Sequence, residues 1–167
     1  MNRNREEKEK IGLVVDPTGN TITYQIIGCA MDVHNRIGPG YKEEIYEKAL
    51  FNECERRGLP VQRQIPVEVV DLDESVGMFY LDMLVSEQVV VEVKAFSHQL
   101  TNDELAQVLN YLKATGHGVG LLFNFGRRKL EYRRIFPPVN DKGPIQRVGR
   151  DSVLKSDLTD LQEQVMK

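Results

Sequence analysis

Two runs decide the fold of this chain, Tyr80-Leu81-Asp82-Met83-Leu84-Val85 and Val89-Val90-Val91-Glu92-Val93-Lys94. Both are rich in apolar and β-branched residues, which predicts β-strands. Because successive strand residues point to opposite faces, Glu92 and Lys94 share one face. An acid and a base on an apolar strand are costly to remove from water unless they have a use. A structural ion pair at the edge of a sheet is the alternative.

The polar connection Ser86-Glu87-Gln88 predicts that these strands, extended to residues 77–85 and 88–96, form an antiparallel hairpin. A hairpin centred on Glu87 places Asp82 opposite Glu92, and directly opposed side chains lie roughly 5 Å apart. Two adjacent carboxylates are hard oxygen ligands that suit Mg²⁺ or Mn²⁺. The sequence therefore predicts a divalent-metal site at Asp82 and Glu92, beside the ammonium of Lys94.

The other segments predict an α/β fold. Further strands are expected at residues 61–70, 119–125 and 129–136, and helices at 21–37, 41–57 and 101–115. The last of these helices opens with Thr101-Asn102-Asp103-Glu104, which fits a capping box. The order α-α-β-β-β-α-β-β predicts a mixed central sheet flanked by helices.

The composition fits one domain with flanking segments. We expect an N-terminal extension at residues 1–20, a domain at 21–137, and a linker with a C-terminal tail helix at 138–167. That helix is predicted to pack on its own domain or on a partner, and a homo-oligomer is a further possibility. Its apolar residues recur at helical spacing: Val153, Leu154, Leu158, Leu161 and Val165.

The location of the protein is expected to be cytoplasmic, with no membrane segment. No apolar run approaches the ~18 residues of a bilayer span, and the charged N-terminus does not resemble a signal peptide. Cys29 and Cys54 are expected to be reduced core thiols. The formal charge of −3 counts against tight non-specific nucleic-acid binding but leaves room for a local basic patch.

The helix at residues 41–57 carries two adjacent acids, Glu43 and Glu44. Its expected inward arc is defined by Ile45, Tyr46, Ala49, Leu50 and Glu53. Glu43 falls at the edge of that arc, whereas Glu44 points away from it. The alternative role for Glu43 is an acid favoured by the positive end of the helix dipole.

The helix at residues 21–37 has an expected apolar stripe that includes Ile26, Ile27, Ala30, Met31 and Ile37. His34 lies on this stripe, and a lone histidine there is more often a hydrogen-bonded core residue than a ligand. His98 and His117 form no ligand spacing with each other, and no role is assigned to them.

The pattern Asp82 followed by Glu92-x-Lys94 resembles the active-site signature of the PD-(D/E)xK nuclease superfamily. Other segments resemble one branch of it, the GxxExxR family, and the resemblance covers roughly residues 25–136. These segments are residues 33–43, residues 46–50, Gln107-x-x-Asn110-Tyr111-Leu112 and residues 120–126.

The resemblance implies a restriction-endonuclease-like core and metal-dependent hydrolysis of phosphodiester bonds, with DNA favoured over RNA. Asp82 and Glu92 would hold Mg²⁺ or Mn²⁺ with the backbone carbonyl of Val93, and Glu43 would contact the metal directly or through water. Lys94 would orient or activate the attacking water. Such roles are physically reasonable, because a divalent ion and a positioned cation stabilise charge that develops on the phosphate.

The resemblance also implies a role for Gln107, which would contact the substrate phosphate or the metal-bound water. Tyr111 is predicted to share its helix face, since the two are four residues apart. The alternative for both is a helix flank that packs on the sheet.

A basic stretch, Arg127-Arg128-Lys129 with Arg133 and Arg134, is expected on the last strand. Arg127 and Arg128 are candidate contacts to substrate phosphates. A solvated edge strand protected from aggregation is the equal alternative.

Three functions remain open from the sequence. The first is a nuclease that uses Glu43, Asp82, Glu92 and Lys94. The second is a catalytically silent protein that keeps the nuclease fold as an interaction scaffold. The third is a nuclease subunit that is active only in a larger assembly.

Overall fold

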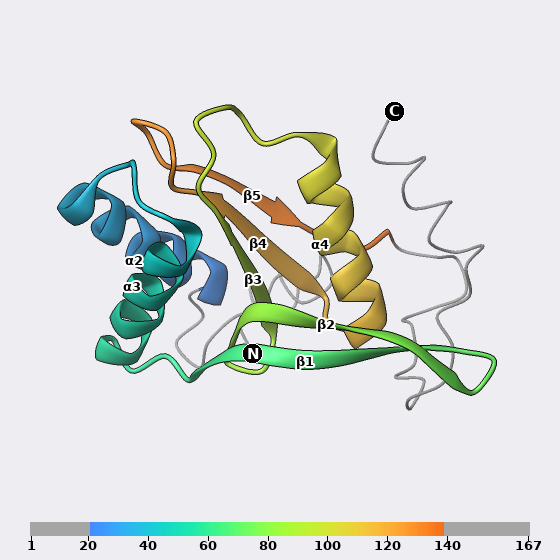
Figure 1. The fold of residues 1–167 in the computed structure, drawn as a ribbon. Helices are drawn as coiled ribbons and strands as arrows, with labels where there is room; N and C mark the ends of the chain where they lie inside the picture. The colour runs from blue at the N-terminus through green and yellow to red at the C-terminus, as the bar shows by residue number, and fades with distance from the viewer. Residues whose placement is uncertain (1–20, 139–167) are drawn as a thin grey trace.

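The computed structural model describes residues 21–138, which form an α/β fold (Figure 1). The predicted N-terminal extension, residues 1–20, lies outside these residues. The predicted linker and tail helix, residues 138–167, also lie outside them apart from residue 138. The order of elements is α-α-β-β-β-α-β-β, as expected. The helices are α2 (Ile22–Ile37), α3 (Glu43–Arg56) and α4 (Asn102–Thr115), and the strands are β1 (Val61–Asp71), β2 (Glu74–Val85), β3 (Val89–Lys94), β4 (Val119–Asn124) and β5 (Glu131–Ile135).

The five strands form one mixed sheet in the order β1-β2-β3-β4-β5. Strands β3 and β4 are parallel, and the other neighbouring pairs are antiparallel. Helix α4 connects the parallel pair, because two parallel neighbours need a crossover. The carboxyl ends of β3 and β4 therefore lie at the same edge of the sheet.

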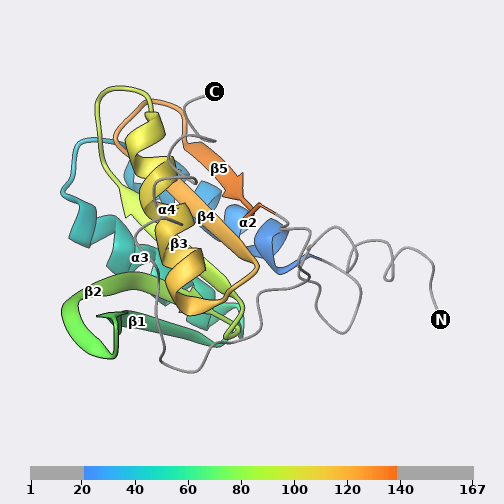
Figure 2. The same ribbon diagram turned by 90° about the vertical axis from the view of Figure 1, so that its right-hand side faces the viewer.

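Helices cover both faces of the sheet. Figure 2 shows α4 in front of the sheet and α2 behind it, and α3 lies beside α2 (Figures 1 and 2). Alternate residues of β3 serve the two cores: Val89, Val91 and Val93 pack with α2 and α3, whereas Val90 packs with α4. A strand buried on both faces is expected to be a near-continuous apolar run, so Glu92 is an exception that needs a reason.

Helix boundaries follow local signals in the sequence. Thr101 caps α4, and Thr101 and Glu104 form the predicted capping box. Gly116 ends this helix in the left-handed conformation that glycine adopts at little cost. Within the described residues, no helix is both long and apolar enough to span a bilayer.

The inward face of α2 differs from its expected stripe. Met31 and Ile37 are exposed, whereas Cys29 and Val33 are fully or almost fully buried. The core selects the face that meets α3 and the sheet, and apolar residues outside it stay in solvent. Cys29 and Cys54 are buried free thiols, consistent with the expectation for reduced core cysteines.

Candidate active site

The hairpin of β2 and β3 brings Asp82 beside Glu92. The paired residues Met83 with Val91, Leu84 with Val90, and Val85 with Val89 give the register expected of a hairpin centred on Glu87. Oδ2 of Asp82 accepts a hydrogen bond of 2.8 Å from the backbone N–H of Val93. The predicted register is therefore confirmed for these three residue pairs, which lead up to Asp82 and Glu92.

Lys94 lies between two carboxylates that come from different elements. Its Nζ is 3.5 Å from Oε1 of Glu92 and 3.9 Å from Oε1 of Glu43. The Lys94 and Glu92 side chains are largely buried, whereas the Glu43 side chain is half exposed. The first turn of α3 thus reaches the end of β3 through Glu43, the acid that helical geometry selected over Glu44.

Burial and mutual repulsion perturb both strand acids. Burial, followed by the charge of Asp82, raises the pKa of Glu92 to about 8. Burial also raises the pKa of Asp82 to about 6, although the Val93 N–H opposes this shift. The form in which both acids are charged is therefore unfavourable near neutral pH. A bound cation would stabilise that form.

One oxygen of Glu92 makes no hydrogen bond. Its Oε2 is buried without a partner, although buried carboxylate oxygens are ordinarily satisfied. A hard divalent cation is a fitting partner for this oxygen and for Asp82. Among residues 21–138, no group of three or more His, Cys, Asp or Glu side chains is arranged to hold a metal. Mg²⁺ often uses only one or two carboxylates together with water and substrate oxygens, so the pair fits this ion.

Helix α4 supplies the polar pair predicted from its i, i+4 spacing. The Gln107 side-chain amide donates a hydrogen bond of 2.5 Å to the Tyr111 hydroxyl. Burial, followed by the charge of Glu92, raises the pKa of Tyr111 to about 12. The Tyr111 ring stacks on Phe79 of β2. The pair therefore lies on the face of the sheet that carries Glu92, within reach of its electric field.

Glu47 is a buried acid of this region that sequence reasoning did not assign. Its Oε1 accepts hydrogen bonds from Arg63 Nε at 3.2 Å and from Gln64 Nε2 at 2.8 Å. Its charge also contributes to the raised pKa of Asp82. Glu47 lies four residues after Glu43, and this spacing was the available signal. The expected inward arc of α3 was wrong at Ile45, which is exposed, because the helix turns Glu47 rather than Ile45 toward β1.

The backbone of Gln64 is unusual. Its φ is +51°, a left-handed value that is uncommon for a residue other than glycine. The paired residues on either side are Arg63 with Met83 and Ile65 with Leu81, so Gln64 lies across from Asp82. This conformation accompanies a side chain that reaches Glu47, and strained backbone of this kind is concentrated at functional sites.

The basic residues lie elsewhere than predicted. Residues 127–129 are in the connection between β4 and β5, and only Arg133 and Arg134 are on β5. The strand begins at Glu131, because its pairing with β4 starts at Asn124. His34 is a hydrogen-bonded core residue, as expected, since its Nε2 lies 2.8 Å from the backbone oxygen of Arg127.

Comparison with known proteins supports the fold and the superfamily. No curated protein matches the chain. The family model described as the PD-(D/E)XK nuclease superfamily matches residues 20–135. The narrower GxxExxR resemblance stays a prediction, because the match is to the superfamily as a whole. The match covers well over half of the chain and includes every strand and helix described above, and the chain belongs to the PD-(D/E)XK nuclease superfamily.

Proposed function

We propose that this protein is a metal-dependent nuclease that hydrolyses phosphodiester bonds, with DNA favoured over RNA. The observation that carries the proposal is the unsatisfied, buried Oε2 of Glu92 next to Asp82 and Lys94. A buried carboxylate that costs stability is retained when it has a chemical task. Membership of the nuclease superfamily supports the same reaction class.

Asp82 and Glu92 would hold Mg²⁺ or Mn²⁺, with the backbone carbonyl of Val93 and with Glu43 directly or through water. When bound, the ion would lower the pKa of a water molecule and stabilise negative charge on the phosphate. The ammonium of Lys94 would orient the attacking water and offset charge at the phosphate. Its ion-pair distances to Glu92 and Glu43 fit this position between the strand and the helix.

Gln107 and Tyr111 would contact the substrate on the α4 side of the site. Their mutual hydrogen bond fixes the orientation of both groups. The Tyr111 hydroxyl is protonated at neutral pH, as in any tyrosine, and burial raises its pKa further, to about 12. It can therefore donate a hydrogen bond to a phosphate oxygen.

The proposal is tested by cleavage of labelled single- and double-stranded DNA and RNA with Mg²⁺, with Mn²⁺ and with EDTA. Wild type, Lys94→Ala and the control Lys48→Ala, an exposed lysine of α3, are purified alike. We expect metal-dependent cutting by wild type and Lys48→Ala and none by Lys94→Ala. Absence of cutting by wild type under every condition, or equal cutting by all three proteins, would overturn the assignment.

A second function, in which the fold serves as an interaction scaffold or an assembly subunit, is favoured by one surface. Val76, Met78 and Tyr80 are exposed on one face of β2, and Leu72 is exposed at the turn before it. In Figure 1 this hairpin extends past α4. Exposed apolar patches of this kind mark interaction sites. The native mass of the purified protein separates a monomeric nuclease from an assembly subunit.

A further inference from the structure

A groove of about 1300 Å³ lies at the sheet edge where β3 and β4 end. Its walls are Pro39 from the α2–α3 connection, Ser97 and Gln99 from the β3–α4 connection, and residues 126–133. This volume exceeds the range of about 300–1,000 Å³ that is usual for small-molecule sites. The space therefore suits a segment of a polymer better than a single small ligand.

The charge of the groove opposes that of the chain. Arg127, Arg128, Lys129 and Arg133 line it, although the chain has a formal charge of −3. Among residues 21–138, the first three of these side chains form no ion pair. Unpaired cations gathered on one concave surface attract a polyanion.

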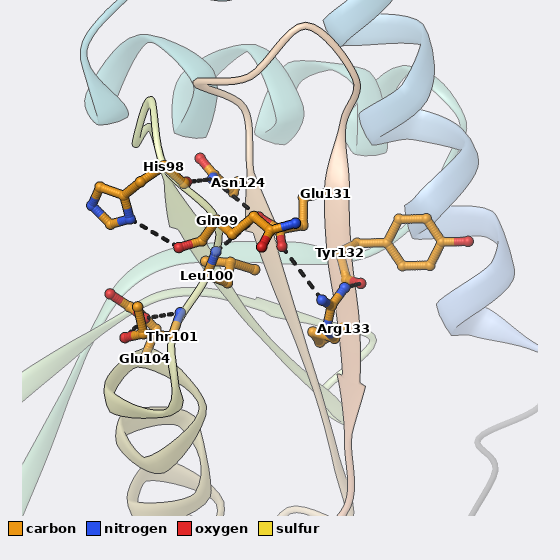
Figure 3. Close-up of polar contacts among 9 residues, drawn as sticks. All are labelled: His98, Gln99, Leu100, Thr101, Glu104, Asn124, Glu131, Tyr132 and Arg133. Carbon is orange, nitrogen blue, oxygen red and sulfur yellow. Dashed lines mark hydrogen bonds and ion pairs between the residues drawn. The ribbon is translucent and has the colours of Figure 1, made fainter.

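Among the described residues, the groove wall holds one acid, Glu131, and it is already engaged. The carboxylate of Glu131 accepts hydrogen bonds from the Leu100 N–H at 2.9 Å and from the Asn124 amide at 3.3 Å. It also pairs with Arg133 at 3.4 Å (Figure 3). The negative charge of Glu131 is therefore largely balanced by these partners. It does not cancel the positive charges of Arg127, Arg128 and Lys129.

The two loops of the groove are tied together by Asn124, which is fully buried. Its Oδ1 accepts hydrogen bonds from the backbone N–H groups of Phe96 and Gly126. Its Nδ2 donates to the backbone oxygen of His98, as Figure 3 shows. His34 holds the β4–β5 connection from the other side through the oxygen of Arg127. A surface fixed in this way loses little entropy when a ligand binds.

The groove is formed by segments that adjoin those of the candidate active site, although no residue of that site lines it. Lys94 pairs with Asn124 across the parallel strands, and the Phe125 N–H donates to the Lys94 oxygen at 2.8 Å. Pro39, which also lines the groove, belongs to the connection that leads into Glu43. A nucleic-acid strand lying in the groove would therefore be held next to the segments that carry Lys94 and Glu43.

We propose that this groove binds the phosphodiester backbone of a nucleic-acid strand, with Arg127, Arg128 and Lys129 on successive phosphates. This inference rests on the proposed nuclease function and adds the surface that holds its substrate. Cations on phosphates set register and affinity without reading sequence. Binding is therefore sequence-independent and strongly dependent on salt.

The experiment measures binding of labelled single-stranded and duplex oligonucleotides in EDTA, at several salt concentrations, by fluorescence anisotropy. It compares wild type with Arg127→Ala/Arg128→Ala, with Arg127→Lys/Arg128→Lys, and with the control Lys48→Ala, which removes one positive charge outside the groove. Thermal unfolding of each protein confirms that it is folded.

Loss of two phosphate contacts should make the slope of log K against log salt shallower by about 1.8 for duplex or about 1.4 for single strands. Affinity should fall in the alanine variant, and the lysine variant should keep the wild-type slope. Lys48→Ala should match wild type. The oligonucleotide, single-stranded or duplex, whose affinity falls more in the alanine variant identifies the form that occupies the groove.

An unchanged slope and affinity in the alanine variant, or no binding by wild type at low salt, would overturn the groove assignment. The metal-dependent cleavage panel keeps this result separate from the enzyme proposal. If wild type cuts but the Arg127→Ala/Arg128→Ala variant binds as wild type does, the groove proposal alone is refuted. Groove-dependent binding without any cutting supports the groove and refutes the nuclease.

Discussion

Glu92 and Lys94 lie on one face of β3 with Oε1 and Nζ 3.5 Å apart, yet the second carboxylate oxygen of Glu92 has no partner. The ion pair therefore satisfies only part of a buried acid. Breaking or neutralising such a group reveals whether it is retained for stability or for chemistry.

Glu92→Gln should stabilise the metal-free protein above pH 8. The raised pKa values of Glu92 and Asp82, about 8 and about 6, mean that the native state keeps protons that the unfolded chain has lost. The free energy of unfolding should therefore fall as the pH rises from about 4 to about 8. In the Glu92→Gln variant, the free energy of unfolding should change much less over this pH range. Denaturant unfolding in EDTA across this range measures it.

The matched control for this experiment is Glu68→Gln, which neutralises an exposed carboxylate of β1. Its pH profile should run parallel to that of wild type. A wild-type stability that rises between pH 5 and pH 8 would contradict the assignment of buried, destabilised acids to this site.

Mg²⁺ or Mn²⁺ should raise the melting temperature of the wild-type protein. An ion that binds only the native state at about 100 times its Kd adds about 2.7 kcal/mol. The gain should be larger at pH 8 than at pH 6, because carboxylate ligands must lose their protons to bind a metal. Asp82→Asn and Glu92→Gln should each abolish most of it. Equal stabilisation of these variants and wild type would show that the ions act elsewhere.

Gly126→Ala should destabilise the protein by about 1–3 kcal/mol. A Cβ at this position would come within 2.4 Å of the Phe96 oxygen, a backbone atom that cannot move aside cheaply. Gly77→Ala is the control, since nothing lies within 4 Å of its added Cβ. Chemical denaturation of both variants compares the two sites, and equal stability of the two would refute the close contact between the loops.

Leu72→Asn with Asp73→Gly should stabilise the β1–β2 hairpin by about 1 kcal/mol. Leu72 and Asp73 have φ values of +47° and +65°, which leucine and aspartate adopt at a cost. Leu72 is 79% exposed, so its replacement removes little packing. Leu72→Ala keeps the unfavourable backbone and should bring no gain. A melting temperature that does not rise in the double variant would contradict this account.

The sequence by itself determined the local part of this protein. The alternating, β-branched strands and the short polar connection predicted the β2–β3 register, and with it the neighbourhood of Asp82 and Glu92, because strand geometry fixes which side chains oppose each other. The capping residues Thr101 and Glu104 predicted the start of α4, because their contacts are made within one helical turn.

Only the tertiary structure decided the contacts between distant segments. Three features depend on how α3 and the loops pack on the sheet. These are the contact between Glu47 and Gln64, the buried Asn124 that joins two loops, and the groove to which Pro39 contributes. Helical periodicity misplaced Ile45 and Met31 because an apolar residue stays exposed when no neighbour covers its face. Local pattern fixes which groups a strand or helix can present, and packing selects which of them meet.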